Sequence, residues 1–317
     1  MSDENKTPPA SPVSDQKGPQ PANQGQTPPS PDKVAQKPAQ KPRAQSFGDP
    51  SGSEIRLHPA SVAVKIELPS RGLLYPGGTP SEVFIKEMRM REMMMLQTPA
   101  LWNENRVFSQ IFENCVSGLP DGFTVLDLFS ADKNAVLVAL RILSFGSVYK
   151  VRVRCPRRTC AHEYDHHLDL EKDLDVKYLE EGELEYPLVI PADWLKCKRE
   201  IKMRLMTFRD EIEIDKKADA ALDKGSIVNT RLKDQLIATT LEIQELDPTM
   251  KTAFIESMTG MDTSVLDQVS SEMYFGMEDE FQATACPKCG EIFKSTMPIN
   301  ENFFRATLPK TRSLAAT

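Results

Sequence analysis

Two short cysteine pairs, far apart in the chain, constrain the fold more than any other feature of this sequence. The first is Cys155-Pro-Arg-Arg-Thr-Cys160 and the second is Cys286-Pro-Lys-Cys289, with the 125 residues 161–285 between them. Tetrahedral Zn²⁺ takes four soft ligands, and two short loops that each supply two thiolates form a zinc ribbon. We therefore predict that Cys155, Cys160, Cys286 and Cys289 bind one structural Zn²⁺ and converge on one point.

The spacing of the cysteines predicts an unusual ribbon. The second pair has two residues between its cysteines and Gly290 directly after them, whereas the first pair has four residues between its cysteines. A small ribbon has about 15 to 20 residues between its pairs. We therefore expect a split ribbon, residues 151–170 and 278–300, that closes around a large and mainly helical insertion, residues 171–277.

Composition restricts the class of protein. The 317 residues are 40% hydrophobic, enough for a core, and carry a net charge of -7, which argues against a general nucleic-acid binder and leaves protein partners as the default. The chain has no apolar run of membrane-helix length, and its start, MSDENKTPP, lacks the apolar centre of a signal peptide. We expect a soluble cytoplasmic product without membrane contact. In that reducing compartment, paired cysteines more often bind metal than form disulfides.

The N-terminal segment has the composition of a disordered chain. Residues 1–52 hold 11 of the 24 prolines and one aromatic residue, Phe47, so they have too little apolar surface to offset the entropy of ordering. We predict a disordered Pro/Gln-rich tail over residues 1–55. It would serve as a solubilising leader or flexible tether, with a partner-binding Pro-rich motif as the alternative.

Residues 56–150 predict a short β-hairpin followed by helices. Alternating Val62, Val64 and Ile66, together with the run 83–85, indicate two paired strands. Helical patterns cover 89–96, 104–116 and 131–145. Ser130 is a suitable N-cap for the last of these helices and Gly146 would end it. Residues 148–154 then alternate as a strand that runs directly into Cys155, with a returning strand over 164–170.

The insertion combines a strand pair with four helices. The strands are expected around 186–190 and 201–206. The helices are expected from a Thr207 cap through Ala221, from an Asn229 or Thr230 cap through Leu241, from Asp247-Pro248 onward, and over 262–273. We expect residues 301–317 to form a C-terminal tail. The predicted class is α+β, mostly helical, with a short N-terminal β-hairpin and the split zinc ribbon.

Two hydrophobic groups are candidates for contact with a partner protein. Met90, Met93 and Met94 lie in a Met-rich run whose thioethers could repack around a partner, although helical spacing also suits core packing. Phe303 and Phe304 are adjacent aromatics in a polar segment. They would either contact a partner or dock the C-terminal segment onto the domain.

The remaining histidines and cysteines have less specific settings. His162 follows Cys160 closely and could replace a cysteine as a metal ligand, although four cysteines already complete a tetrahedron. We interpret His166 and His167 as surface residues of a strand. Cys115 lies on an apolar helix face and Cys197 has no partner at short spacing, so we expect both to be structural.

Catalytic motifs are missing from the sequence. It contains no Gly-rich phosphate loop, no Gly-x-Ser-x-Gly elbow and no His-Glu-x-x-His helix. Four thiolates close the coordination shell of zinc, whereas a catalytic zinc keeps an open position. We therefore predict a protein that is not an enzyme.

Several motifs follow one another in a distinctive order: Leu68-Pro-Ser-Arg-Gly72, Tyr75-Pro76, a Met/Glu helix, Arg141-Ile-Leu-Ser-Phe-Gly146, Cys155-Pro156, Cys286-Pro-Lys-Cys-Gly290 and Asn302-Phe-Phe-Arg305. This order resembles the baseplate hub assembly proteins of T-even-type contractile-tailed bacteriophages, over residues 60–306. The resemblance implies a non-enzymatic hub component or hub assembly factor, whose partners are other baseplate hub, tail-tube or tape-measure proteins. It also implies a location in the host cytoplasm during assembly, or in the tail baseplate of the virion.

A zinc-ribbon regulatory protein that binds nucleic acid is the alternative function. Arg152, Arg154, Arg157 and Arg158 lie close together at the first cysteine pair and could contact phosphates. The acidic balance of the chain and the lack of interleaved aromatics for base stacking argue against this alternative. A metalloenzyme would need an open zinc site.

Overall fold

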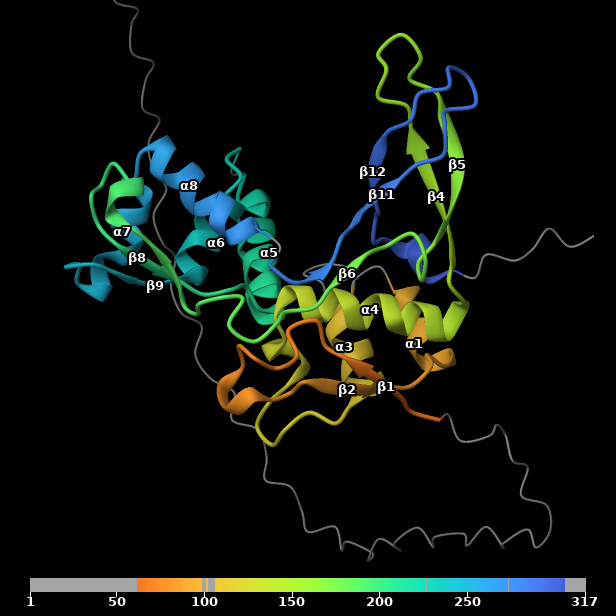
Figure 1. Ribbon diagram of the computed structural model, residues 1–317, viewed down its shortest axis with the longest axis horizontal. Helices are drawn as coiled ribbons and strands as arrows, with labels where there is room; N and C mark the ends of the chain where they lie inside the picture. The colour runs from red at the N-terminus through yellow and green to blue at the C-terminus, as the bar shows by residue number, and fades with distance from the viewer. Residues whose placement is uncertain (1–61, 99–100, 102–105, 226, 273, 306–317) are drawn as a thin grey trace, which may run out of the picture. The chain divides into compact units, whose positions relative to one another are not determined.

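The computed structural model describes residues 62–98, 101, 106–225, 227–272 and 274–305 (Figure 1). About 39% of these residues are helical and 20% lie in strands, so the α+β class is confirmed. The expectation of a mostly helical chain is wrong, because the strands form several small antiparallel sheets. The tail predicted over 1–55 lies outside the described residues, as do residues 306–317, and the other domain boundaries stay predictions.

The helices of the described chain are α1 (Met90–Leu96), α3 (Arg106–Cys115), α4 (Ser130–Phe145), α5 (Phe208–Asp223), α6 (Arg231–Thr239), α7 (Lys251–Glu256) and α8 (Gly260–Ser271). The strands are β1 (Val64–Glu67), β2 (Glu82–Ile85), β3 (Val116–Ser117), β4 (Val148–Arg154), β5 (Glu163–Asp169), β6 (Val176–Lys177), β7 (Leu188–Ile190), β8 (Ile201–Met203), β9 (Thr240–Ile243), β10 (Gly276–Met277), β11 (Glu280–Gln282) and β12 (Lys294–Thr296). Their sheets have the orders β1-β2-β3, β4-β5, β6-β10, β7-β8-β9 and β11-β12.

The predicted N-terminal hairpin is present. β1 pairs with β2 in antiparallel register, with Val64 opposite Ile85, and β3 extends the sheet. The helices that follow bury apolar residues at helical spacing, as Val107, Ile111 and Cys115 of α3 show. These side chains belong to one buried core, which also contains the inward faces of β4, β5 and β11.

A buried carboxylate fixes the loop between β1 and β2 to the start of α4. Asp132 is fully buried and accepts hydrogen bonds from the Ser70 amide at 2.9 Å, the Ser70 hydroxyl at 2.6 Å and the Tyr75 hydroxyl at 2.7 Å. The prediction that Ser130 caps this helix is wrong. The helix already includes Ser130, and its N-cap is the preceding residue Phe129, whose side chain makes no capping hydrogen bond.

Gly146 ends α4 as predicted. Its φ of 83° lies in the left-handed region that favours glycine, and its N–H donates to the Ile142 carbonyl at 2.8 Å. The chain can therefore turn from α4 directly into β4.

The insertion has a sheet of its own. β7, β8 and β9 pair antiparallel, with Ile190 opposite Ile201 and Ile201 opposite Ile243. This sheet confirms the predicted strand pair and adds a third strand, so the insertion is less helical than expected. The predicted helix through Leu241 is wrong at its end, because α6 stops at Thr239 and the next residues pair with β8.

The sheet and helices of the insertion enclose a second core. Its buried apolar side chains are Leu188, Ile190, Leu195, Ile201, Met203, Leu236, Ile243, Ile255 and Leu266. Thr207 caps α5 as predicted, since its hydroxyl accepts a hydrogen bond from the Asp210 amide. At the base of the insertion, β6 pairs with β10, with Lys177 opposite Gly276, so the strands that enter and leave it are joined.

None of the described helices is both long enough and apolar enough to cross a lipid bilayer.

Candidate metal centre

The first cysteine pair lies at the loop end of a regular β-hairpin. β4 and β5 pair over seven positions, from Val148 opposite Asp169 to Arg154 opposite Glu163. Alternate residues of β4 are buried, and Cys155 continues this alternation at 2% exposure. The Cys155 N–H donates to the His162 carbonyl at 2.9 Å, which closes the loop. Strand periodicity therefore points Cys155 toward the protein interior.

The second cysteine pair lies in the loop of another hairpin. β11 pairs with β12, and the ladder continues through the Ala283 N–H, which donates to the Phe293 carbonyl at 3.0 Å. Two backbone hydrogen bonds close the loop. The Cys286 N–H donates to the Glu291 carbonyl at 2.8 Å, and the Gly290 N–H donates to the Cys286 carbonyl at 2.8 Å. Gly290 has φ of 74°, a conformation in which a side chain would be strained.

Contacts between β5 and the segment around β11 hold the two hairpins side by side (Figure 1). The His166 ring stacks on Phe281 with centroids 5.2 Å apart, and its Nδ1 lies 3.3 Å from the Thr284 hydroxyl. Tyr164 donates its hydroxyl to the Thr284 carbonyl. The interpretation of His166 as strand surface is wrong because β11 covers this face of β5, whereas His167 is exposed as expected.

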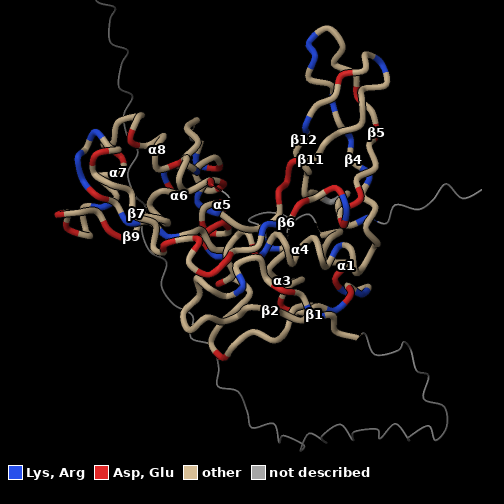
Figure 2. Tube along the Cα trace, in the orientation of Figure 1, with Lys and Arg blue, Asp and Glu red and all other residues tan. Residues whose placement is uncertain are grey.

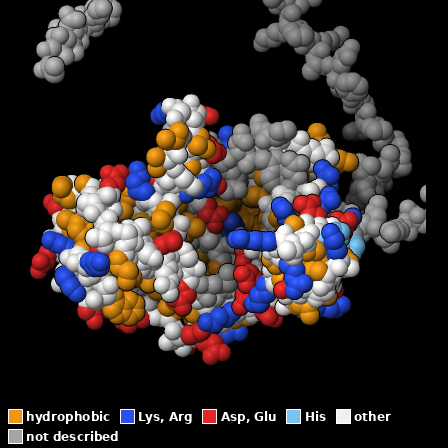
Figure 3. All heavy atoms as spheres, turned by 90° about the horizontal axis from the view of Figure 1, so that it is seen from above, with side chains coloured by type: hydrophobic (Ala, Val, Ile, Leu, Met, Phe, Trp, Pro, Cys, Tyr) orange, Lys and Arg blue, Asp and Glu red, His pale blue; other side chains and the backbone are white. Residues whose placement is uncertain are grey.

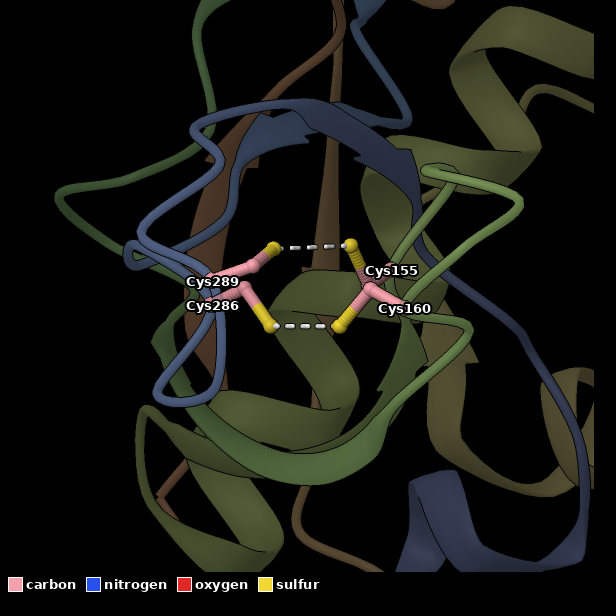
Figure 4. A group of neighbouring side chains, drawn as sticks. All are labelled: Cys155, Cys160, Cys286 and Cys289. Carbon is pink, nitrogen blue, oxygen red and sulfur yellow. Dashed lines mark hydrogen bonds between the residues drawn. The ribbon is translucent and has the colours of Figure 1, made fainter.

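The four sulfur atoms meet between the two loops (Figure 4). All four Sγ atoms lie within 4.8 Å of one another, with 3.6 Å between Cys155 and Cys289 and 3.8 Å between Cys160 and Cys286. Four sulfurs bound at about 2.3 Å to one tetrahedral Zn²⁺ would lie about 3.8 Å apart. A disulfide needs about 2.05 Å. The predicted convergence is confirmed, and the four thiols have the spacing of a metal tetrathiolate.

The environment shifts the pKa values of Cys155, Cys160 and Cys286 in different directions. Burial raises the pKa of Cys155 to about 12 and also raises the pKa of Cys160. Burial acts in the same direction on Cys286, but the backbone amides of Lys288 and Cys289 donate to its sulfur and lower its pKa to about 7. Four thiolates this close would repel one another, so a cation among them is needed to keep all four deprotonated.

Other sulfur and imidazole groups of the described chain stay apart from this cluster. His162 is not among the grouped ligand atoms, and its ring stacks on Tyr164 at 6.2 Å instead. Cys115 is buried as predicted, and burial raises the pKa of its thiol to about 12, which makes it a poor nucleophile. Cys197 is half-buried against the second core.

The candidate partner-contact residues fall into two groups. Met90 and Met94 are exposed at 74% and 62%, one helical turn apart on α1, while Met93 packs partly against the first core. As a partner surface, these methionines stay a prediction. Phe303 and Phe304 are buried, so in this structure they dock the C-terminal segment onto the domain and neither ring is open to a partner.

Arg141 is a buried anchor that sequence patterns did not predict. Its guanidinium is fully buried in α4 and donates to the carbonyls of Phe303, Gly146, Val148 and Arg305. The only sequence signal is a basic residue within the apolar face of a helix. Its acceptors are backbone carbonyls, which leave no pattern in the sequence.

Comparison with known protein families matches residues 83–305 to the family described as T4 bacteriophage base plate protein. The matched range begins in β2 and contains both cysteine pairs and the whole insertion. No curated protein and no solved structure matches the chain.

Proposed function

Because the chain belongs to the T4 bacteriophage base plate protein family, we propose that it is a non-enzymatic hub component of a phage baseplate, or a factor that assembles the hub. The family match over residues 83–305 is the observation that carries this proposal. Membership implies contacts with other baseplate or tail proteins. We propose hub, tail-tube or tape-measure proteins as these partners, met in the host cytoplasm during assembly and then in the virion tail.

The cysteine cluster has a structural role in this proposal. Four thiolates are soft ligands that select Zn²⁺ over Mg²⁺ or Ca²⁺, and the sulfur spacing suits a tetrahedron. Bound zinc would hold the 155–160 loop against the 286–289 loop. Since four protein ligands leave no position for a water or substrate, this site supports a structural function and gives no reason to expect catalysis.

The baseplate role is tested in phage-infected cells. We expect a phage that lacks this gene to accumulate tail precursors without complete baseplates, and an affinity-tagged chain to recover named hub or tail-tube proteins, identified by mass spectrometry. Normal baseplates in the deletion phage, together with no recovery of tail proteins, would contradict the proposal. The control is complementation of the deletion by the untagged gene in trans.

A further inference from the structure

Charged side chains on the β4/β5 hairpin form a ladder that is displaced by one step. Lys150 pairs with Asp165 at 2.7 Å, and Arg152 pairs with Glu163 at 3.5 Å. In the strand register, Asp165 lies opposite Arg152 and Glu163 lies opposite Arg154. Lys150 therefore pairs with the acid that lies opposite Arg152, and Arg152 pairs with the acid that lies opposite Arg154. Arg154 is the last residue of β4, and the acid opposite it, Glu163, is already paired with Arg152.

This displacement leaves uncompensated positive charge beside the metal centre. Arg154, Arg158 and Lys288 are exposed, and within the described ranges none of them has an acidic group within ion-pair distance. Arg157 of the same loop does have one, Glu291 at 2.8 Å. In Figure 2, Lys and Arg mark the two loops beyond β4 and β11. Figure 3 shows Lys and Arg side chains beside the histidines, whose described members all come from residues 162–167.

The unpaired arginines also line a recess. A hollow of about 350 Å³ is lined by Arg154, Cys155, Pro156, Arg157, Arg158 and Ala161. No carboxylate is among these residues, and two of the three lining arginines, Arg154 and Arg158, have no acidic partner in the described chain, so the lining carries excess positive charge in a chain whose net charge is -7. Arginine binds carboxylates through two parallel hydrogen bonds, and a local patch of opposite sign steers a partner to one place on a surface.

We propose that this recess, together with Lys288 on the facing loop, docks an acidic, carboxylate-rich segment of a partner protein. A single exposed ion pair contributes little, about 0.2 to 1 kcal/mol, so the partner segment must present several carboxylates at once. A nucleic acid fits less well, because sequence-independent binding relies on many phosphate contacts, whereas this site offers three unpaired cations with Glu163, Asp165 and Glu291 beside them. This inference rests on the proposed function in one respect, namely that the partner is a protein.

The test measures binding of a fluorescein-labelled deca-glutamate peptide to the zinc-loaded full chain by fluorescence anisotropy. The variant Arg154→Gln/Arg158→Gln/Lys288→Gln removes the unpaired cations. The matched control, Lys150→Gln/Arg152→Gln/Lys294→Gln, removes as many positive charges from the same hairpins, but each of its cations has an acidic partner. We expect at least about tenfold weaker binding for the first variant and less than about threefold for the control, with both effects reduced by added salt.

Three results would overturn the inference: no binding to the wild-type chain at low salt, equal losses in the two variants, or tighter binding of a labelled single-stranded DNA 20-mer than of the peptide. Zinc content and thermal unfolding are measured for every variant. If the triple variant loses zinc, peptide binding is compared instead between the single variants Arg158→Gln and Lys150→Gln, and a larger loss in Arg158→Gln is expected. Because the isolated chain is used, failure here leaves the baseplate role intact, which the infected-cell experiment tests separately.

Discussion

Arg141 carries a positive charge into the core, and within the described chain it meets backbone carbonyls instead of a carboxylate. Burial lowers the pKa of its guanidinium, and the four accepting carbonyls offset the cost of removing this charge from water. Two of these carbonyls belong to Phe303 and Arg305. This one residue therefore ties α4 to the C-terminal segment, which closes over Tyr149 through the Phe303 ring at 5.1 Å.

Replacing Arg141 tests this anchor. We predict that Arg141→Met lowers the free energy of unfolding by about 3 kcal/mol, because it leaves several buried carbonyls without a donor. Urea unfolding followed by circular dichroism measures the loss. Arg91→Met, at an exposed arginine of α1, is the matched control and should change stability by less than about 0.5 kcal/mol. Similar small effects in both variants would show that Arg141 does not anchor the segment.

His166 predicts a pH dependence. It is buried at 6% exposure between β5 and β11, and burial lowers its pKa below the usual 6.5, against an opposing effect of Asp173 and with a smaller contribution from His167. Its Nε2 finds no hydrogen-bond partner among the described residues. Protonation of His166 therefore favours the unfolded chain. The stability that neutral His166 contributes is complete above about pH 6.5, and it is lost as the pH falls from there through the lower pKa of the folded state.

We therefore expect the free energy of unfolding, measured in excess zinc, to fall more steeply from pH 7.5 to 5.5 in the wild-type chain than in His166→Phe. The difference between the two slopes should be at most about 1.4 kcal/mol per pH unit, the limit for one titrating group. Phenylalanine keeps the ring against Phe281 and removes the titrating group. Thermal unfolding at each pH gives the slopes, and His167→Gln on the exposed face is the control. Equal slopes in wild type and His166→Phe would exclude His166 as the cause.

At the scale of elements, local sequence patterns predict most of what the structure contains. Alternation identified β1 and β4, helical periodicity identified α3, and a capping residue identified the start of α5, while the β7–β8 pair was also expected from the sequence. Apart from the one-residue error at the start of α4, two errors occurred where a distant segment decides the outcome. β9 forms because β8 offers it hydrogen bonds, and His166 is buried because β11, more than a hundred residues later, covers it. Such pairings are set by tertiary packing, which overrides local propensity.

The two cysteine loops are the elements whose coupling is most open to test. We predict that Cys289→Ser lowers zinc affinity at least about 100-fold and lowers the midpoint of thermal unfolding by at least about 5 °C, because the remaining three thiolates leave the shell open. Cys197→Ser, at a cysteine outside the cluster, is the control and should keep wild-type zinc content. Competition with a chromophoric chelator measures the affinities. Unchanged affinity in Cys289→Ser would remove it from the ligand set.

At the scale of the whole molecule, contacts at the base of the insertion and at the loop ends of the two hairpins tie distant parts of the chain together. β6 and β10 pair at its base, and residues such as Leu205 and Tyr274 pack against both cores. The cysteine cluster joins the two hairpins at their loop ends. A zinc-finger peptide gains about 10 to 16 kcal/mol from its metal because nothing else orders it. Here, Val151 of β4 and Phe281 of β11 are already buried in the first core, so a bound metal would have less to stabilise.

Removal of zinc should therefore loosen one end of the protein without unfolding it. We predict that a strong chelator increases amide hydrogen exchange in residues 155–162 and 284–292, while β7, β8 and α6 keep their protection. Hydrogen exchange with mass spectrometry resolves these segments. Uniform loss of protection across both cores would show that the metal supports the whole fold, and no change anywhere would show that it supports neither loop.

The central claim is that one zinc ion joins two cysteine pairs separated by 125 residues (161–285). Zinc K-edge X-ray absorption on the purified full chain tests it directly, with metal content measured on the same sample. We predict one zinc per chain, surrounded by four sulfur atoms at about 2.3 Å. A chain that contains no zinc, or a zinc bound by fewer than four sulfurs, would contradict it.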